Sequence, residues 1–239
     1  NDFFFLQGRS EEQVAQADRD LEAEELSDAD VKYSIREEAP PRETKEGYKV
    51  FVVKNGKLYP PMVANPNAED TPVGVWLNAD VGTRAPDSKT GRMQVKAGGK
   101  GTQGGSGSLA FRPGWHLGET PLATQFDRLN PETGVKELFP ENFVWALCDI
   151  AADHDYQEEA MSYGYTKNGK FQHSLAGLPK LPTDGYYKYR TNPNPDTVPW
   201  LITGAMKVKK LLSDAEVNVI LAEKGLPPKQ RVGGDKTLA

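Results

Sequence analysis

The chain has 239 residues, enough for one domain whose core needs no metal or disulfide. Its single cysteine, Cys148, cannot form an internal disulfide and favours a reducing compartment. No apolar run reaches the roughly 20 residues of a membrane span. We therefore expect a cytoplasmic protein without a membrane partner. The chain begins at Asn1 rather than at methionine, which indicates a piece of a longer polypeptide.

The N-terminal segment differs from the rest of the chain in charge. Residues 1–47 hold fourteen acidic and six basic side chains, a net charge of −8, so the total of −5 leaves the remainder at +3. A capping box predicts a helix over Ser10–Leu26, and paired prolines predict a linker over Glu37–Gly47. We expect an acidic helical tail and linker over residues 1–47, which is either a solvated linker or a shield for a basic site.

The body, residues 48–239, is expected to be a single α+β effector-like domain. Apolar alternation and an Asn-Gly hairpin signal predict strands at Tyr48–Val53, Lys57–Val63, Val73–Ala79, Ser108–Arg112, Tyr186–Arg190 and Trp200–Lys207, with a buried central strand at Phe143–Ala151. Short helices are expected at Pro121–Arg128 and Asp155–Tyr163, and the chain is expected to close on a helix that starts at Ser213 and stops at Gly225. The expected fold class is α+β, with mostly antiparallel sheets and short helices between the acidic tail and a C-terminal helix.

Several kinds of site are missing from the sequence. It has no cysteine pairs, no His-Glu-x-x-His, no calcium loop, no Walker A loop and no Gly-x-Ser-x-Gly, so we expect no metal. Cys148 lies mid-strand and is expected to be a core residue. Gly99–Gly104 matches G-x-G-x-x-G but leads into a strand, so it is expected to be a flexible loop. Residues 84–113 carry six bases and one acid, which suits either a phosphate-bearing ligand or a solvated loop.

The most suggestive stretch runs from Leu109 to Glu119. Arg112 ends an expected strand, Pro-Gly turns the chain, and Trp115 and His116 follow. Arginine offers a rigid donor fork for phosphate, and histidine can bind hydroxyls or carry protons. The stretch predicts an anion-plus-ring pocket, or else a structural corner in which Arg112 pairs with an acid and the other two residues pack and cap.

A second cluster is formed by tyrosines that alternate along one expected strand. Tyr187 and Tyr189 share one face and Tyr186 takes the other, with Arg190 following. Tyr163 lies upstream. Aromatic residues interleaved with arginine suit stacking on a base or on nicotinamide, although such residues also fill half-buried sheets.

Three runs resemble C-terminal segments of large polyvalent (multi-domain) proteins of phages and conjugative elements of gut bacteria. The runs are Lys57–Asn65, Phe111–Gly118 and Tyr189–Pro193, and the likeness spans roughly residues 31–239. The resemblance implies a bacterial cytoplasmic setting, other domains in the parent polypeptide and a role in conflict between mobile element and host.

The aromatic-Arg step followed by His-x-Gly also resembles the first NAD-binding motif of the ADP-ribosyltransferase superfamily, and Trp200–Gly204 looks like its last strand. The resemblance implies NAD as cofactor, with Arg112 on the pyrophosphate, His116 on the ribose, and Tyr163 or Tyr187 stacked on nicotinamide. Arg190 is a further candidate for cofactor binding. The superfamily usually places a glutamate near the last strand; that strand has none here, and Glu119 or Glu158 could substitute, with Glu119 the chosen catalytic candidate.

Two alternatives stay open. A metal-independent ribonuclease toxin would use His116 or His173 as general base or acid, with Arg112 or Arg190 on the scissile phosphate. A non-enzymatic module would bind a nucleic acid or a host protein.

Overall fold

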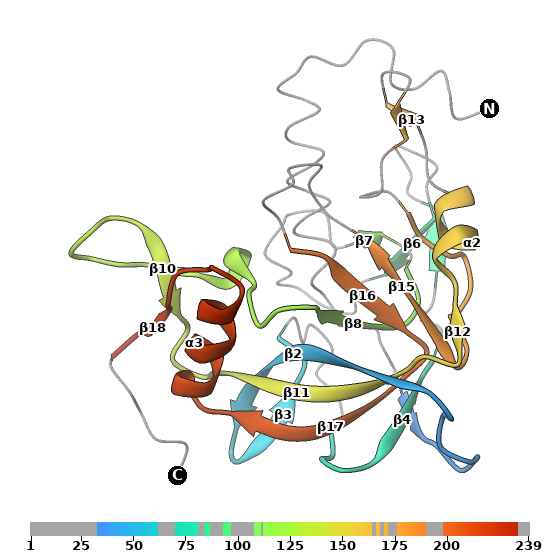
Figure 1. The fold of residues 1–239 in the computed structure, drawn as a ribbon, viewed down its shortest axis with the longest axis horizontal. Helices are drawn as coiled ribbons and strands as arrows, with labels where there is room; N and C mark the ends of the chain where they lie inside the picture. Colours follow the sequence, from blue (N-terminus) through green and yellow to red (C-terminus); the bar gives the residue numbers. More distant parts are fainter. Residues whose placement is uncertain are drawn as a thin grey trace.

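The computed structural model describes residues 33–61, 70–80, 84–86, 93–96, 108–110, 112–163, 166–167, 170–171, 176–189 and 198–233 (Figure 1). The strands of the largest sheet are β1 (Tyr33–Ile35), β2 (Thr44–Lys54), β3 (Lys57–Tyr59), β4 (Trp76–Ala79), β8 (Trp115–Gly118), β11 (Phe143–Ala151), β12 (His154–Asp155), β15 (Gly185–Tyr189), β16 (Trp200–Thr203) and β17 (Ala205–Leu212). Smaller sheets contain β5 (Arg84–Pro86), β6 (Met93–Lys96), β7 (Ser108–Ala110), β9 (Arg128–Leu129), β10 (Lys136–Phe139), β13 (Thr166–Lys167), β14 (Lys170–Phe171) and β18 (Gln230–Arg231). The helical elements in these ranges are η2 (Thr124–Phe126), α2 (Gln157–Ser162) and α3 (Asp214–Glu223).

The largest sheet has ten strands and is mainly antiparallel. Its order is β1-β4-β17-β11-β2-β8-β16-β15-β12, with β3 paired to β2. The one parallel pair among these neighbours joins β12 to β15. The expected mostly antiparallel pairing is therefore confirmed, and the described residues form many strands and few helices.

The centre of this sheet follows the sequence pattern closely. β11 pairs along its whole length with β2, and it carries buried residues on both faces, as expected for a central strand. β2 turns into β3 through Asn55 and Gly56, whose φ angles of 52° and 70° are those of a two-residue hairpin. The predicted central strand and the predicted hairpin are both confirmed.

The sheet curls around one of its faces, which we call the inner face. The indole nitrogen of Trp115 on β8 donates to the carbonyl oxygen of Leu77 on β4 at 3.0 Å, although these strands are not neighbours in the sheet. Arg36, which follows β1, forms an ion pair at 2.6 Å with Asp184, which precedes β15 near the other end of the sheet. The two ends of the sheet therefore meet over an inner core that contains Phe51, Leu77, Trp115, Leu117, Cys148 and Met206.

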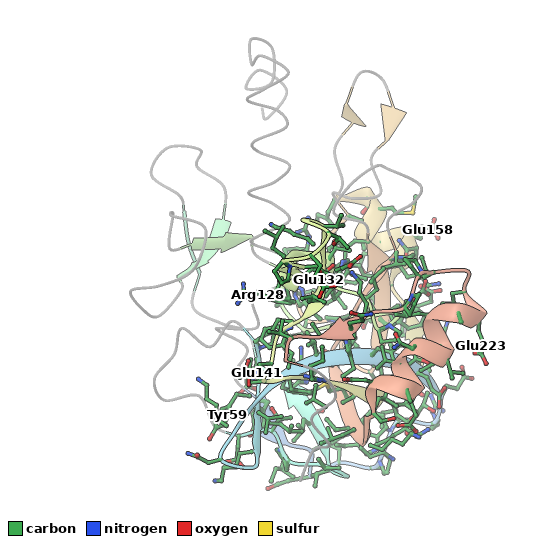
Figure 2. The ribbon with its side chains drawn as sticks, turned by 90° about the vertical axis from the view of Figure 1, so that its left-hand side faces the viewer. Tyr59, Arg128, Glu132, Glu141, Glu158 and Glu223 are labelled. Atoms are coloured by element: carbon green, nitrogen blue, oxygen red, sulfur yellow. The ribbon has the colours of Figure 1, made fainter. Side chains whose placement is uncertain are left out.

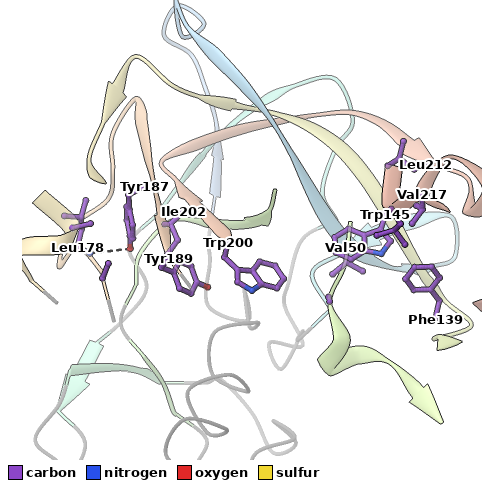
Figure 3. Close-up of a cluster of buried hydrophobic side chains, with 14 residues drawn as sticks. Val50, Phe139, Trp145, Leu178, Tyr187, Tyr189, Trp200, Ile202, Leu212 and Val217 are labelled. Atoms are coloured by element: carbon purple, nitrogen blue, oxygen red, sulfur yellow. Dashed lines mark hydrogen bonds between the residues drawn. The ribbon is translucent and has the colours of Figure 1, made fainter. Parts of the chain in front are cut away.

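The opposite, outer face is packed against residues of η2, β10, α2 and α3. Figure 3 shows Tyr187, Tyr189, Trp200 and Ile202 grouped beside Leu178, and a second group around Trp145 farther along the sheet. Helix α3 covers the second group with Val217 and Leu221, whereas α2 contributes Ala160. The tyrosines of β15 divide as expected, since Tyr186 belongs to the inner core.

Helix α3 begins with the capping box that the sequence suggests: the Ser213 hydroxyl accepts from the Glu216 amide, and the Glu216 carboxylate accepts from the Ser213 amide. The chain does not close on this helix, because β18 follows it and pairs in parallel with β10. The expected N-terminal helix at Ser10–Leu26 lies outside the described residues.

Other segments differ from expectation. Residues 33–35 and 44–47 belong to the sheet, whereas the sequence placed them in the tail and linker. The expected helix at Pro121–Arg128 is limited to the short turn η2, because Ala123 and Phe126 pack into the outer-face core and this packing overrides the local helix signal. β8 was not expected, since its four residues follow directly on the Pro-Gly turn. No helix formed by the described residues is long and apolar enough to cross a membrane.

Candidate functional site

Strand pairing brings the candidate residues onto the outer face of three neighbouring strands. His116 on β8 lies opposite Ile202 on β16, which lies opposite Tyr187 on β15. The next row contains Trp200 and Tyr189. Because alternate residues of a strand point to the same face, these side chains form one continuous patch.

The imidazole of His116 is hydrogen-bonded to two other residues of the described part of the chain. Nε2 lies 2.9 Å from the carbonyl oxygen of Arg112, and Nδ1 lies 3.3 Å from the hydroxyl of Tyr189. A carbonyl oxygen can only accept, so Nε2 carries the proton. In the neutral ring Nδ1 is then an acceptor, and the Tyr189 hydroxyl donates to it. These two bonds select one tautomer and fix the plane of the ring.

Arg112 is held by the same tyrosine. Its guanidinium carbon lies 4.9 Å from the centroid of the Tyr189 ring, and its Nε donates to the carbonyl oxygen of Ala176 at 3.3 Å. Gly177 lies against the side chain, since a Cβ there would sit 3.4 Å from Nε. Arg112, His116 and Tyr189 are therefore mutually connected, and we call them the Arg–His–Tyr cluster.

The turn between Arg112 and His116 needs a glycine. Gly114 has a φ of 138°, and a Cβ at this position would lie 2.7 Å from Cγ2 of Ile202 and 2.9 Å from the carbonyl oxygen of Thr203. The backbone at Gly114 is therefore in close contact with β16. This close approach lets the Arg112 carbonyl return to the imidazole four residues later.

Tyr189 lies beneath the other two members of the cluster. Its side chain is 1% exposed, whereas Arg112 and His116 are partly exposed. The phenol therefore supports the guanidinium and the imidazole from the core. The sequence placed Tyr189 in the aromatic patch but did not select it as a site residue; its alternation with Tyr187 was the available signal.

The other sequence candidates lie apart from this cluster. Tyr187 has no exposed surface, and its hydroxyl accepts from the Leu178 amide at 3.4 Å, so its ring is not accessible for stacking in this conformation. Tyr163 follows α2 and is 56% exposed. Arg190 and His173 lie outside the described residues.

Glu119 lies beside the start of β16 but does not contact His116. Its amide donates to the carbonyl oxygen of Pro199 at 3.2 Å, one residue before β16. Its carboxylate forms an ion pair with Lys188. Lys188 alternates with Tyr187 and Tyr189, so the Glu119 carboxylate pairs with a side chain from the opposite face of β15.

A second polar group lies near Glu119 and was missed by the sequence. The Lys45 ammonium donates to the Tyr186 hydroxyl at 3.0 Å, and this hydroxyl lies 3.4 Å from a carboxylate oxygen of Asp155. The hydrogen bond to Tyr186 raises the pKa of Lys45, and the charges of Glu119 and Asp155 add to the effect. Lys45 was assigned to the linker, so no sequence signal linked it to the tyrosine.

Two further findings limit the chemistry of the described part of the chain. Burial raises the pKa of the Cys148 thiol to about 12, so this core cysteine stays protonated at neutral pH. Among the described residues, no three His, Cys, Asp or Glu side chains gather as a metal site.

Comparison with protein-family models, curated proteins and solved structures finds no match to this chain.

Proposed function

We propose that the chain is an ADP-ribosyltransferase-like effector domain of a mobile genetic element, which uses NAD to modify a protein or nucleic acid in the cytoplasm of a bacterial host. The observation that carries the proposal is the Arg–His–Tyr cluster. One buried phenol holds both the guanidinium and the imidazole that the family resemblance assigns to NAD. Such support from the core fixes binding groups before the ligand arrives.

In this proposal Arg112 binds the pyrophosphate and His116 binds a hydroxyl of the nicotinamide ribose. Arginine suits the first role because its planar fork matches phosphate oxygens. A ribose hydroxyl can donate to Nδ1 of His116 in place of Tyr189. The reaction breaks the bond between C1′ of the ribose and the nicotinamide nitrogen, which leaves with the electron pair. The acceptor nucleophile forms the new bond to C1′ and loses its proton.

The proposed reaction also calls for a carboxylate near the nicotinamide ribose, and two residues are candidates for it. A negative charge near C1′ would stabilise the positive charge that develops as nicotinamide leaves. Glu119 is the candidate beside β16, and it would have to leave Lys188 and turn from the inner face toward the cluster on the outer face. Glu158 is exposed on α2 and is the other carboxylate considered.

The test is transfer of label from NAD to host macromolecules. The full chain is incubated with labelled NAD and bacterial lysate, alongside His116→Ala and the control His154→Ala, which removes an exposed histidine of β12. We expect labelled products with the wild type and with His154→Ala, and none with His116→Ala. Absence of transfer, together with no NAD-dependent rise in melting temperature, would reject the proposal.

A non-enzymatic binding module is the second candidate, and one observation favours it. Both ring nitrogens of His116 and the carboxylate of Glu119 are engaged within the chain. In this alternative, the cluster binds a nucleotide or single-stranded nucleic acid without bond cleavage. A rise in melting temperature with NAD or single-stranded RNA, without any labelled product, would support it.

A further inference from the structure

A lysine is buried in the inner core directly beneath the candidate site. Lys49 is 2% exposed, and its ammonium lies 5.8 Å from the ring centroid of Phe51 and 5.7 Å from that of Trp115. Lysine is rarely buried to this extent, because the charged form is costly to remove from water. The burial of the Lys49 ammonium therefore needs an explanation, either structural or functional.

The Lys49 ammonium donates to the backbone carbonyl oxygen of His116 at 2.9 Å. The reason for this bond lies in the sheet. β2 and β8 pair only through Tyr48 and Gly118, whereas β2 pairs with β11 over nine residues. The two halves of the sheet are thus joined by a narrow seam, and the side chain of Lys49 crosses it where the ladder of backbone bonds does not continue.

His116 is therefore hydrogen-bonded on both sides of the sheet. On the outer face, Tyr189 and the Arg112 carbonyl bind the imidazole, at 3.3 Å and 2.9 Å. On the inner side, Lys49 binds the backbone of the same residue. The backbone of His116 is thus held by Lys49 and by its pairing with β16, and its ring is held by the outer bonds.

We propose that Lys49 is a positioning residue for His116. Its ammonium anchors β8 to β2 at the residue that carries the imidazole, so that Nδ1 meets the Tyr189 hydroxyl and Nε2 meets the Arg112 carbonyl. The effect of Lys49 on the imidazole does not depend on what the protein does, whereas its effect on NAD affinity rests on the function proposed above. Lys49 touches neither the ligand nor the reacting atoms.

The first experiment compares Lys49→Met with Lys54→Met in the full chain. Methionine keeps the apolar stem of Lys49 and removes the donor, and Lys54 is an exposed lysine of the same strand. Long-range proton–nitrogen NMR reports which ring nitrogen of each histidine carries the proton. We expect the wild type and Lys54→Met to show His116 with the proton on Nε2, and Lys49→Met to lose this single tautomer while His154 is unchanged. A folded Lys49→Met with an unaltered His116 signal would overturn the proposal.

The second readout is NAD affinity in the same proteins. We expect a loss of roughly tenfold in Lys49→Met, as for a hydrogen bond from a charged group, and no change in Lys54→Met. If the wild type binds no NAD, the proposed function fails, and the tautomer measurement still decides the role of Lys49.

A third measurement covers the case in which Lys49→Met does not fold. The Lys49 ammonium is observed directly by proton–nitrogen NMR in the wild type and in His116→Gln, which removes the ring while leaving the backbone carbonyl. We expect the ammonium signal to move or broaden in His116→Gln, because the outer bonds of the imidazole no longer help to hold the residue whose carbonyl binds Lys49. An ammonium signal that is identical in the two proteins would show that Lys49 and the imidazole are independent.

Discussion

Arg112→Ala is the substitution that best separates a binding role from a structural one. In the structure, the side chain stacks on Tyr189 and donates to the carbonyl oxygen of Ala176, so it is not a loose surface group. Alanine removes both contacts and leaves the backbone carbonyl that accepts from His116. The substitution therefore tests the guanidinium and leaves the imidazole bond in place.

The expected cost can be worked from these two contacts. A hydrogen bond from a charged donor contributes about 1.5 kcal/mol, and 3.3 Å places this one at the long end of the range. A partly desolvated cation–π contact contributes about 1 kcal/mol. We therefore expect Arg112→Ala to lower the free energy of unfolding by about 2 to 3 kcal/mol, which exceeds the cost of removing an ordinary surface side chain.

Urea unfolding of Arg112→Ala and Arg128→Ala measures this difference. Arg128 extends from β9 and is exposed, as Figure 2 shows, so its removal should change stability by less than about 0.5 kcal/mol. An Arg112→Ala protein as stable as the control would show that the stacking is absent in solution. A loss of about 5 kcal/mol or more would indicate a buried ion pair and refute the binding role.

Three further predictions concern the corner, the core and α3. Gly114→Ala should destabilise the protein by about 3 kcal/mol or more in urea unfolding, because its φ is 138° and the new Cβ would overlap Ile202; a near-neutral effect would mean that the turn rearranges. Cys148 should resist alkylation in the folded protein and react after unfolding, since burial raises its pKa to about 12; rapid labelling of the native protein would contradict this. Glu216 has its pKa lowered to about 2, mainly by its hydrogen bond with Lys210, so it stabilises the fold above its ordinary value of 4.5 and loses this effect as the pH falls toward 2. The stability difference between wild type and Glu216→Gln should therefore be present at neutral pH and shrink across that range, and a constant difference would argue against the ion pair.

The sequence predicted correctly those elements that depend on residues close together in the chain. The Asn55-Gly56 turn requires positive φ at both positions, and the apolar run of β11 suits only a strand buried on both faces. The capping residues of α3 are equally local. These signals act within a few residues, so they can be read without the rest of the chain.

The site could be predicted only in part, because its contacts join distant segments. Arg112 and His116 are four residues apart and were found together. Tyr189, which supports both, comes from a strand more than seventy residues later in the sequence. Lys49 reaches His116 across a seam that depends on the strand order, and no local pattern marks a lysine as buried. Glu119 was chosen as a substitute for the glutamate that the resemblance implies, and its pairing with Lys188 depends on which face of β15 each side chain takes.

Equilibrium binding of labelled NAD to the full chain shows whether the Arg–His–Tyr cluster is a nucleotide site. The wild type is compared with Arg112→Lys, which keeps the charge and loses the fork, and with Arg128→Lys, which makes the same change at an exposed position on β9. We expect the wild type and Arg128→Lys to bind NAD alike, and Arg112→Lys to bind it more weakly by roughly tenfold or more. Equal binding by all three proteins, or no binding by any of them, would contradict the assignment of the Arg–His–Tyr cluster as a nucleotide site.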